Sequence, residues 1–534
     1  MQLRAAPPRA PALRRPPCRA QRPRCAVPAR ATAQQQQTAQ LGETAVVIGA
    51  SFAGLLSAAA LAPHFGRVVV LDRDAALPGL AGSAAAPRKG VPQSSQPHVL
   101  FARGLRELEA ALPGVTADLL AEGALPVDWS SEFRVFVGDA WAAQSDVVAG
   151  TAPDDVASLT CSRYVLESAA RRRLAARNNV NFRPSARVSA LLRSGGAVAG
   201  VALDSGEALP AALTVDAAGR GSGCASWLAA AGFSDDVAGP AAATVDGGLR
   251  YATRVFRLPS GTAADVAAPP WKVLLLSHEA PQRRRLGYAA RLEGNRLVAT
   301  LGGYERDAPP LDDVAWRAFA ATLPGDGAFL KALEGAVPEA GYEAAQAHAA
   351  TANVRRAFAP LPGLCHVGDS AMALCPAYGQ GMTQAALAAC QLRDAAKQAA
   401  DDVASGRLDA PAALAAISAA MATQSPEAKA AWALAAGQDA AFPAAVVAGV
   451  ELPSASAMPP PLAWYAKALR RRAAVDPKAW KAMLRVAHSI APPQTLISPG
   501  LAASVLAAEA RDAWRRAWAP KKAAAAAASS SERH

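Results

Sequence analysis

The stretch from Thr44 to Gly66 carries no Asp, Glu, Lys or Arg, which is the length and composition expected of a membrane-spanning helix. The turn Gly49-Ala-Ser-Phe-Ala-Gly54 divides it, however, into a short apolar run and a helix-forming segment that stops at Pro63. A second apolar run follows at once and ends in Asp72. A strand, a glycine turn, a helix and a strand that ends in an acid predict a βαβ unit that binds a dinucleotide, rather than a membrane span.

Each position of this unit has a chemical role. Gly49 permits the tight turn after the first strand, and Gly54 lets the helix pack closely on that strand. The amides at the helix N-terminus favour a diphosphate, and Asp72 is placed to accept ribose hydroxyls. Ser51 stands where the motif has its middle glycine, so we expect its side chain to turn aside and its hydroxyl to donate to a phosphate oxygen.

Two later segments have the composition of further cofactor contacts. Short alternating runs from 186 to 204 predict a meander, and the strand that follows ends in Asp216 before a glycine turn at Gly219. The other segment begins with Gly368-Asp369, whose carboxylate suits the hydroxyls of a sugar alcohol. It continues into Pro376-Ala-Tyr-Gly379-Gln-Gly381-Met382, and the helix after it directs its N-terminal amides at an anion.

These three segments, in this order, resemble the FAD-binding fold shared by aromatic-ring hydroxylases, squalene epoxidase and geranylgeranyl reductase. From about 44 to 395 the chain is also similar to FAD-dependent oxidoreductases of the hydroxylase type, the group A flavin monooxygenases, for example at Arg88-Lys-Gly-Val-Pro-Gln93. The resemblance implies FAD as the cofactor. It implies contacts to FAD at Gly49, Ser51, Gly54, Asp72, Arg163, Asp216, Gly219, Gly368, Asp369, Pro376, Gly379, Gly381 and Met382.

The resemblance also divides the cofactor among these residues. It implies that Asp369 binds the ribityl chain, that Pro376 borders the isoalloxazine, and that the amides from Gly379 to Met382 face its N1 and C2 carbonyl. A helix N-terminus at that place stabilises the negative charge of reduced flavin. For Arg163 the alternative is an arginine on a solvated helix face.

The fold class that we predict is α/β. It has a doubly wound Rossmann-type FAD domain of the glutathione-reductase kind, an inserted antiparallel substrate sheet and C-terminal helices. The inserted sheet has four strand candidates, at 249–258, 271–277, 285–292 and 296–304. The expected parts are an FAD-binding domain at 41–104, 158–245 and 350–395, a substrate domain at 105–157 and 246–349, a helical region at 396–520 and a disordered tail at 521–534.

These features predict a flavin oxidoreductase. We expect a monooxygenase that uses NAD(P)H and O2 on an apolar or aromatic small molecule. The same motifs allow a flavin-dependent reductase or dehydrogenase of an isoprenoid lipid, or a non-catalytic membrane or assembly protein that keeps FAD as structure. No acid–base pair is visible, and His98, Arg250 and Tyr304 are the polar residues that we would test first, each with a structural role as its alternative.

Residues 1–40 hold eight Arg and no Asp, Glu or Lys, and they are rich in Ala and Pro. This composition predicts a disordered transit peptide, for the chloroplast rather than the mitochondrion because the prolines interrupt an amphipathic helix. Without these residues the net charge falls from +12 to +4, which is too small to indicate a nucleic-acid partner.

The cysteines form no CxxC pair and have no histidine at metal-ligand spacing, so we expect no metal site. Near Trp480, Trp514 and Trp518 the C-terminal helices are apolar on one face and basic on the other. This pattern predicts packing onto the body of the protein, with peripheral membrane contact as the alternative. The oligomeric state stays open.

Overall fold

The computed structural model describes residues 41–144, 155–234, 241–259, 271–305, 307–450 and 460–531. The expected transit peptide at 1–40 lies outside these ranges. All the elements below belong to the unit Thr38–His534.

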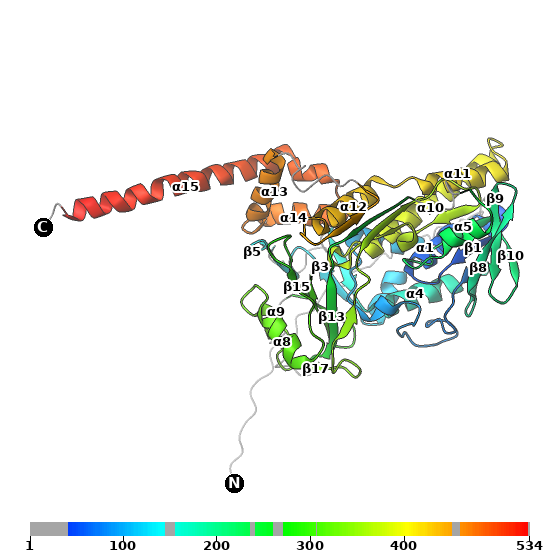
Figure 1. Cartoon of the computed structure of the whole chain (residues 1–534), viewed down its shortest axis with the longest axis horizontal. Coiled ribbons are helices and arrows are strands. Elements are labelled where there is room, and N and C mark those ends of the chain that lie inside the picture. The colour runs from blue at the N-terminus through cyan, green and yellow to red at the C-terminus, as the bar shows by residue number, and fades with distance from the viewer. Residues whose placement is uncertain are drawn as a thin grey trace, which may run out of the picture. The chain divides into compact units, whose positions relative to one another are not determined.

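A five-stranded parallel sheet, in the order β20-β11-β1-β2-β7, contains the first apolar runs. Figure 1 labels its strand β1 and the helix α1 that follows it. Its strands are β1 (Gly42–Ile48), β2 (Phe65–Leu71), β7 (Val180–Arg183), β11 (Leu213–Asp216) and β20 (Leu364–His366). The uncharged stretch therefore folds as β1, α1 (Phe52–Leu61) and the start of β2. Among the helices of the described ranges, none is long and apolar enough to cross a membrane.

Alternate residues of β1 enter two different cores, as the pleat of a strand requires. Ala45 and Val47 pack with three helices, which are α1, α4 (Arg163–Ala175) and α10 (Gly381–Ala404). Val46 and Ile48 pack against α5 (Cys224–Ala230) and a three-stranded antiparallel sheet. That sheet is the predicted meander, with β8 (Val188–Ser194), β9 (Ala197–Leu203) and β10 (Ala208–Pro210). One face of this sheet is thus covered by helices, and the other by α5 and the antiparallel strands of the alternating segment.

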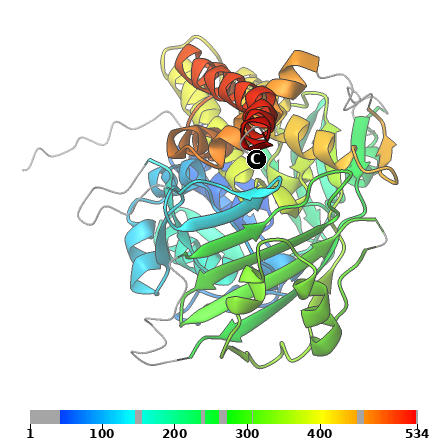
Figure 2. The same ribbon diagram turned by 90° about the vertical axis from the view of Figure 1, so that its left-hand side faces the viewer.

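A second sheet has the order β17-β13-β16-β15-β14-β4-β5, with β18 paired to β13 (Figure 2, mainly green). Its strands are β4 (Phe133–Val137), β5 (Ala140–Trp141), β13 (Arg250–Arg257), β14 (Val273–Leu276), β15 (Arg285–Leu292), β16 (Arg296–Gly303), β17 (Val337–Pro338) and β18 (Gln346–His348). The four predicted strands correspond to β13 to β16. Gly294 and Asn295 in the β15–β16 turn have φ of +69° and +56°, the left-handed conformation that such tight hairpins favour.

Shorter elements join the two sheets. They are η1 (Pro92–Ser95), α2 (Ala102–Ala111), α3 (Val115–Ala121), β3 (Leu125–Asp128), β6 (Ala157–Thr160), α8 (Asp313–Ala321), α9 (Ala328–Lys331), η2 (Gly368–Ser370) and η3 (Pro376–Tyr378). A four-stranded sheet has the order β21-β19-β12-β22. Its strands are β12 (Ala241–Asp246), β19 (Asn353–Ala357), β21 (Met372–Ala373) and β22 (Val446–Ala448).

The C-terminal region is helical, with two corrections. Its helices are α11 (Ala410–Ala422), α12 (Pro426–Asp439), α13 (Pro460–Ala473), α14 (Pro477–Ala487), η5 (Pro493–Ile497) and α15 (Pro499–Ser531). The region also supplies β22, because a pair of valines there adds to the edge of β12. The expected disorder from residue 521 is wrong as far as Ser531, since the alanine run continues α15 and alanine has the highest helix propensity.

Candidate functional site

The three glycine-bearing segments meet at the carboxyl edge of the parallel sheet. A Cβ added at Gly49, after β1, would lie 2.6 Å from the carbonyl oxygen of Ala217, after β11. A Cβ added at Gly368, after β20, would lie 2.8 Å from Cβ of Ala53 in α1. Segments that are distant in the sequence therefore form one continuous surface.

Gly54 is required by the approach of α1 to β1. A Cβ at Gly54 would lie only 1.8 Å from the carbonyl oxygen of Gly49, which itself has a φ of +105°. At the start of the helix, the Phe52 amide donates to Glu167 Oε1 over 3.2 Å. The amides of Ala53 and Gly54 have no acceptor within the described ranges. These are the groups that a helix N-terminus offers to a phosphate.

Glu167 of α4 is the centre of a buried charge cluster beside this turn. Its Oε1 accepts from Ser51 Oγ at 2.6 Å and from Arg163 Nε at 2.8 Å, and Arg163 Nη2 donates to Ser51 Oγ at 3.0 Å. Burial opposes its charge, but Arg163, Arg88 and Arg171 together lower the pKa of Glu167 to about 2. The Ser51 hydroxyl thus donates to a carboxylate here, where we had expected a phosphate oxygen.

Asp72 ends β2 as predicted, but its carboxylate faces protein groups. Its Oδ2 accepts from the Ala50 amide at 2.8 Å and from Arg88 Nη1 at 3.0 Å, and its Oδ1 accepts from the Asp74 amide at 2.9 Å. Only 8% of the residue is exposed. The predicted contact to a ribose stays a prediction, and the segment that begins at Arg88 folds back over the carboxylate.

Asp216 shapes its own loop. Its Oδ1 accepts from the Ala218 amide at 3.0 Å and its Oδ2 accepts from Ser222 Oγ at 2.7 Å. Asp216 is fully buried, whereas Gly219 has a φ of +82° and faces open space. A ligand that approaches this loop closely would therefore contact the backbone at Gly219.

Asp216, Cys224 and His366 also place possible metal ligands within 4.8 Å of one another. The carboxylate is already engaged by the loop, and burial raises the pKa of the Cys224 thiol. In this structure the Asp216 carboxylate is thus committed to its own loop, with His366 Nδ1 3.3 Å from its Oδ2.

The third segment lies beside further arginines. Gly368 has a φ of +72°, and Asp369 follows it half-buried. Burial raises the pKa of Asp369, while Arg220, Arg163 and Arg356 act in the opposite direction. Arg356 also donates to the carbonyl oxygen of Asp369 over 3.2 Å. The carboxylate is thus held among cations at the carboxyl end of β20.

The same segment ends at the N-terminus of α10. Gly379 closes η3 with a φ of +65°, and a Cβ there would come within 3.3 Å of Phe101 Cζ. Gly381 faces open space, whereas the side chain of Met382 is buried in the core of the first sheet. Pro376 and Gly379 line a cavity of about 2110 Å³.

This cavity lies between the second sheet and helices α12, α13 and α14. Its buried apolar lining comprises Phe101, Trp129, Phe133, Val135, Leu249, Leu286, Trp432, Leu469, Trp480 and Leu484. The ring centroids of Phe101 and Trp129 are 5.7 Å apart. Trp129 Nε1, Trp480 Nε1 and His488 Nε2 are buried donors without an acceptor in the described part of the chain.

A hydroxyl network adjoins the cavity at Tyr378. Asp439 Oδ1 accepts from Tyr378 OH at 2.6 Å and from Tyr304 OH at 3.1 Å, and its Oδ2 accepts from Asn353 Nδ2 at 2.8 Å. His278 Nε2 lies 3.3 Å from each hydroxyl. Burial raises the pKa of Asp439, although four donors stabilise its charge. Tyr378 and His278 line the cavity, so the network reaches the cavity through them.

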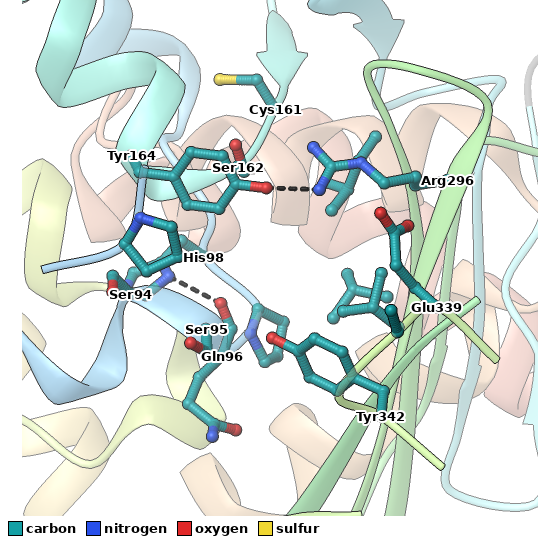
Figure 3. A pocket seen from close by; sticks show the side chains of 16 residues that line it. Ser94, Ser95, Gln96, His98, Cys161, Ser162, Tyr164, Arg296, Glu339 and Tyr342 are labelled. Carbon is teal, nitrogen blue, oxygen red and sulfur yellow. Dashed lines mark hydrogen bonds between the residues drawn. The ribbon is translucent and has the colours of Figure 1, made fainter. Parts of the chain in front are cut away.

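The three polar residues singled out from the sequence are not brought together. His98 lines a separate pocket of about 160 Å³, in which its Nδ1 lies 2.9 Å from the Gln96 carbonyl oxygen (Figure 3). Burial lowers the pKa of His98 to about 3, so the ring is neutral. Tyr304 is fully buried in the network around Asp439. Arg250 donates to the neighbouring Leu249 carbonyl and is not among the residues that line the large cavity.

The sequence analysis missed four residues of the site, which are Glu167, His278, Tyr378 and Asp439. Glu167 had a usable signal, because it lies one turn after Arg163 at the spacing of an ion pair. Tyr378 lay inside a segment that we had singled out. Asp439 had no local signal, since only tertiary packing brings the end of α12 to β19 and η3.

The donor set fits a dinucleotide diphosphate. Free amides at Ala53 and Gly54, the guanidinium of Arg163 and the open backbone at Gly219 and Gly381 surround the junction of the three segments. A helix N-terminus with an arginine beside it suits a doubly charged phosphate pair. The residues present thus favour a diphosphate at the turn and an uncharged ring toward the apolar cavity.

Comparison with solved structures defines the class of fold. PqsL of Pseudomonas aeruginosa, described as a probable FAD-dependent monooxygenase, is similar with a TM-score of 0.53 and 18% identity, over 75% of this chain and 97% of PqsL. The Diels-Alderase PyrE3 of pyrroindomycin biosynthesis has a TM-score of 0.51 and 16% identity, over 84% of this chain and 81% of PyrE3. The chain has the fold of FAD-dependent monooxygenases.

A relative in sequence places the chain more closely. Protein Rv3254 of Mycobacterium tuberculosis is 33% identical over 368 residues, which cover 66% of this chain and 73% of the relative. The chain belongs to the family of Protein Rv3254. No model in the scan of protein families matches the chain.

Proposed function

We propose that this protein is an FAD-dependent oxidoreductase that acts as a monooxygenase, with NAD(P)H as electron donor and O2 as co-substrate. The observation that carries the proposal is the meeting of three glycine-bearing segments at one sheet edge, beside an apolar cavity of about 2110 Å³. Sites of α/β proteins lie at this edge. We further propose that the FAD domain is of the Rossmann, glutathione-reductase-like kind, which the central position of β1 and the meander support.

In this proposal the protein's own residues bind and orient the cofactor and exclude water from it. The amides of Ala53 and Gly54 with Arg163 would hold the diphosphate, and Asp369 would accept ribityl hydroxyls. The N-terminus of α10 at Gly381 would orient the ring system. When bound, the flavin would supply two-electron transfer between the nicotinamide and the substrate or oxygen. The apolar walls keep the reacting groups away from water.

One experiment tests this function. The purified full chain is denatured, the released cofactor is identified by its absorbance, and the native protein is titrated with NADH or NADPH with and without O2. Release of FAD and nucleotide oxidation that consumes O2 are expected. Double-bond reduction of an isoprenoid without O2 would instead indicate a reductase, and a flavin that neither nucleotide nor dithionite reduces would indicate a non-catalytic protein. Colourless protein that refuses added FAD would exclude all three.

We also propose import into the chloroplast, supported by the composition of residues 1–40. A fluorescent reporter fused to these residues should enter plastids of plant or algal cells, and targeting to mitochondria would favour the alternative. Peripheral membrane contact remains a proposal as well, supported by twelve Lys or Arg against three Asp or Glu in residues 460–531.

A further inference from the structure

The large cavity exceeds the needs of a one-ring substrate. Its volume of about 2110 Å³ compares with the roughly 300–1,000 Å³ of typical small-molecule pockets. One part adjoins Pro376 and Gly379, where the proposed flavin ring would lie, and the rest extends between the second sheet and the C-terminal helices. The remaining space fits an extended molecule.

The buried wall of this cavity offers no charge to a ligand. Apart from its apolar and aromatic residues, its buried ionisable lining consists of Tyr251, His278 and His488. Burial lowers the pKa of His278 to about 4 and that of His488 to about 3, so both rings are neutral at pH 7. An ionised group placed against this wall would lose its hydration and gain no opposite charge, only neutral donors such as Trp129 Nε1, Trp480 Nε1 and His488 Nε2. The buried wall therefore selects the apolar part of a ligand.

The half-buried and exposed lining, by contrast, is cationic. It contains Arg283, Arg355, Lys429, Lys467, Arg470 and Arg471 against Asp139 and Glu279. Arg283 and Arg470 pair with those two acids, and Arg471 pairs with Glu509. The other three, Arg355, Lys429 and Lys467, have no carboxylate partner in the described ranges. Charge on this rim is thus left for a ligand.

One of the unpaired cations lies over an indole ring, and a second lies one helical turn from the same tryptophan. The guanidinium carbon of Arg355 lies 5.0 Å from the ring centroid of Trp432. Lys429 precedes Trp432 by three residues on α12, which places it one turn away on the same side of the helix. Trp432 is buried and lines the cavity. An anionic head between Arg355 and Lys429 would leave the body of the ligand on the indole and the apolar wall.

We infer that the cavity binds an extended apolar molecule with one anionic group, carboxylate or phosphate, whose head lies at Arg355 and Lys429 and whose apolar body points toward Pro376. This inference rests on the proposed function for the identity of the ring beside Pro376. Charge at the rim attracts the anionic head, and the buried wall excludes that head. The apolar end of the molecule therefore enters the cavity first. The group nearest the proposed flavin is then part of the apolar body.

The inference is tested on the full chain, with its cofactor as isolated, by calorimetric titration with matched ligands. Dodecanoate and dodecyl phosphate carry an anionic head, and dodecan-1-ol has the same chain with an uncharged head. We expect the anions to bind about tenfold more tightly than the alcohol at low salt, and the difference to shrink as salt is added. In the double variant Arg355→Gln/Lys429→Gln the anions should bind as weakly as the alcohol. Lys397→Gln, at an exposed site on α10 outside the cavity, should leave the preference unchanged.

Other outcomes overturn the inference. Equal binding of alcohol and anions, no saturable binding by any of the three, or a preference that survives in the double variant would each do so. Vesicles of phosphatidylglycerol separate the two sources of such an anion. Binding to vesicles without binding of free dodecanoate would mean a docking surface and no internal site. Flavin content is measured on the same samples. If the wild-type protein contains no FAD but still prefers the anions, the proposed function is refuted and this inference stands.

Discussion

Arg88 Nη1 lies 3.0 Å from Oδ2 of Asp72, and only 4% of the Arg88 side chain is exposed. The same nitrogen lies 3.0 Å from Asp74 Oδ2, and Nη2 lies 3.6 Å from Glu167 Oε2. One cation thus fixes the end of β2, the loop after it and the helix that faces the glycine turn. The candidate site depends on this cluster even where no ligand touches it.

Replacement Arg88→Met would leave the carboxylates of Asp72 and Glu167 buried without their shared cation. We expect the free energy of unfolding to fall by about 3–5 kcal/mol, the range for a broken buried ion pair. Urea unfolding measures it. The control is Arg407→Met, because 60% of the Arg407 side chain is exposed in its pair with Asp402, and there we expect a change below about 1 kcal/mol. Equal losses in the two variants would contradict the role of Arg88.

Replacement Gly54→Ala would place a methyl group 1.8 Å from the Gly49 carbonyl oxygen. Since the obstacle is backbone, α1 must move away from β1, and we expect a loss of about 3 kcal/mol or more in the free energy of unfolding, together with loss of bound flavin. The control is Gly437→Ala in α12, where nothing lies within 4 Å of the added atom. That change should stabilise the protein by up to about 1 kcal/mol. A tolerated Gly54→Ala would refute the close approach.

Acid should weaken the fold in a defined window. Burial lowers the pKa of His278 to about 4 and of His488 to about 3, whereas an unfolded histidine titrates near 6.5. Between these values the unfolded chain binds more protons, so the free energy of unfolding falls as pH drops from about 6.5, by up to about 1.4 kcal/mol per pH unit for each histidine. Below about 4.5 Glu167, with its pKa lowered to about 2, adds to the loss.

Unfolding in urea at a series of pH values from 7 to 4.5 checks this dependence. His488→Gln should reduce the slope of the free energy of unfolding against pH by the contribution of one proton, up to about 1.4 kcal/mol per pH unit. A slope that is the same in the wild type and the variant would show that His488 is protonated in the folded protein.

Replacement Tyr304→Phe removes a donor to the buried Asp439 carboxylate, which then keeps Tyr378, Asn353 and Cys375. We expect a loss of about 1–3 kcal/mol in the free energy of unfolding. The matched control is Tyr288→Phe in β15 of the second sheet, because the Tyr288 hydroxyl is buried without a partner in the described ranges. Its removal should cost less than about 0.5 kcal/mol. A larger loss at Tyr288 than at Tyr304 would contradict this assignment.

Local pattern was sufficient for much of the fold. Gly49 and Gly54 at their spacing predicted the β1–α1 turn, and alternation predicted the meander and β13 to β16, because these features depend on near neighbours in the chain. The same reasoning could not see long-range partners. Arg88 covers the Asp72 carboxylate, so the expected ribose contact stays a prediction, and the alanine run after 521, expected to be disordered, continues α15.

The sequence by itself determined the parallel βαβ pair of β1 and β2, where the glycine turns lie and that the three segments belong together. The parallel pairing of β4 with β14 was not predicted, because an antiparallel substrate sheet was expected. Only the tertiary structure decided the walls of the cavity and the charges on its rim. Arg355, Lys429 and Lys467 come from β19, α12 and α13, and Asp439 reaches Tyr304 over 135 residues. Contacts of this range are set by the packing of whole helices and sheets, a property of shape and volume that no local pattern of residues encodes.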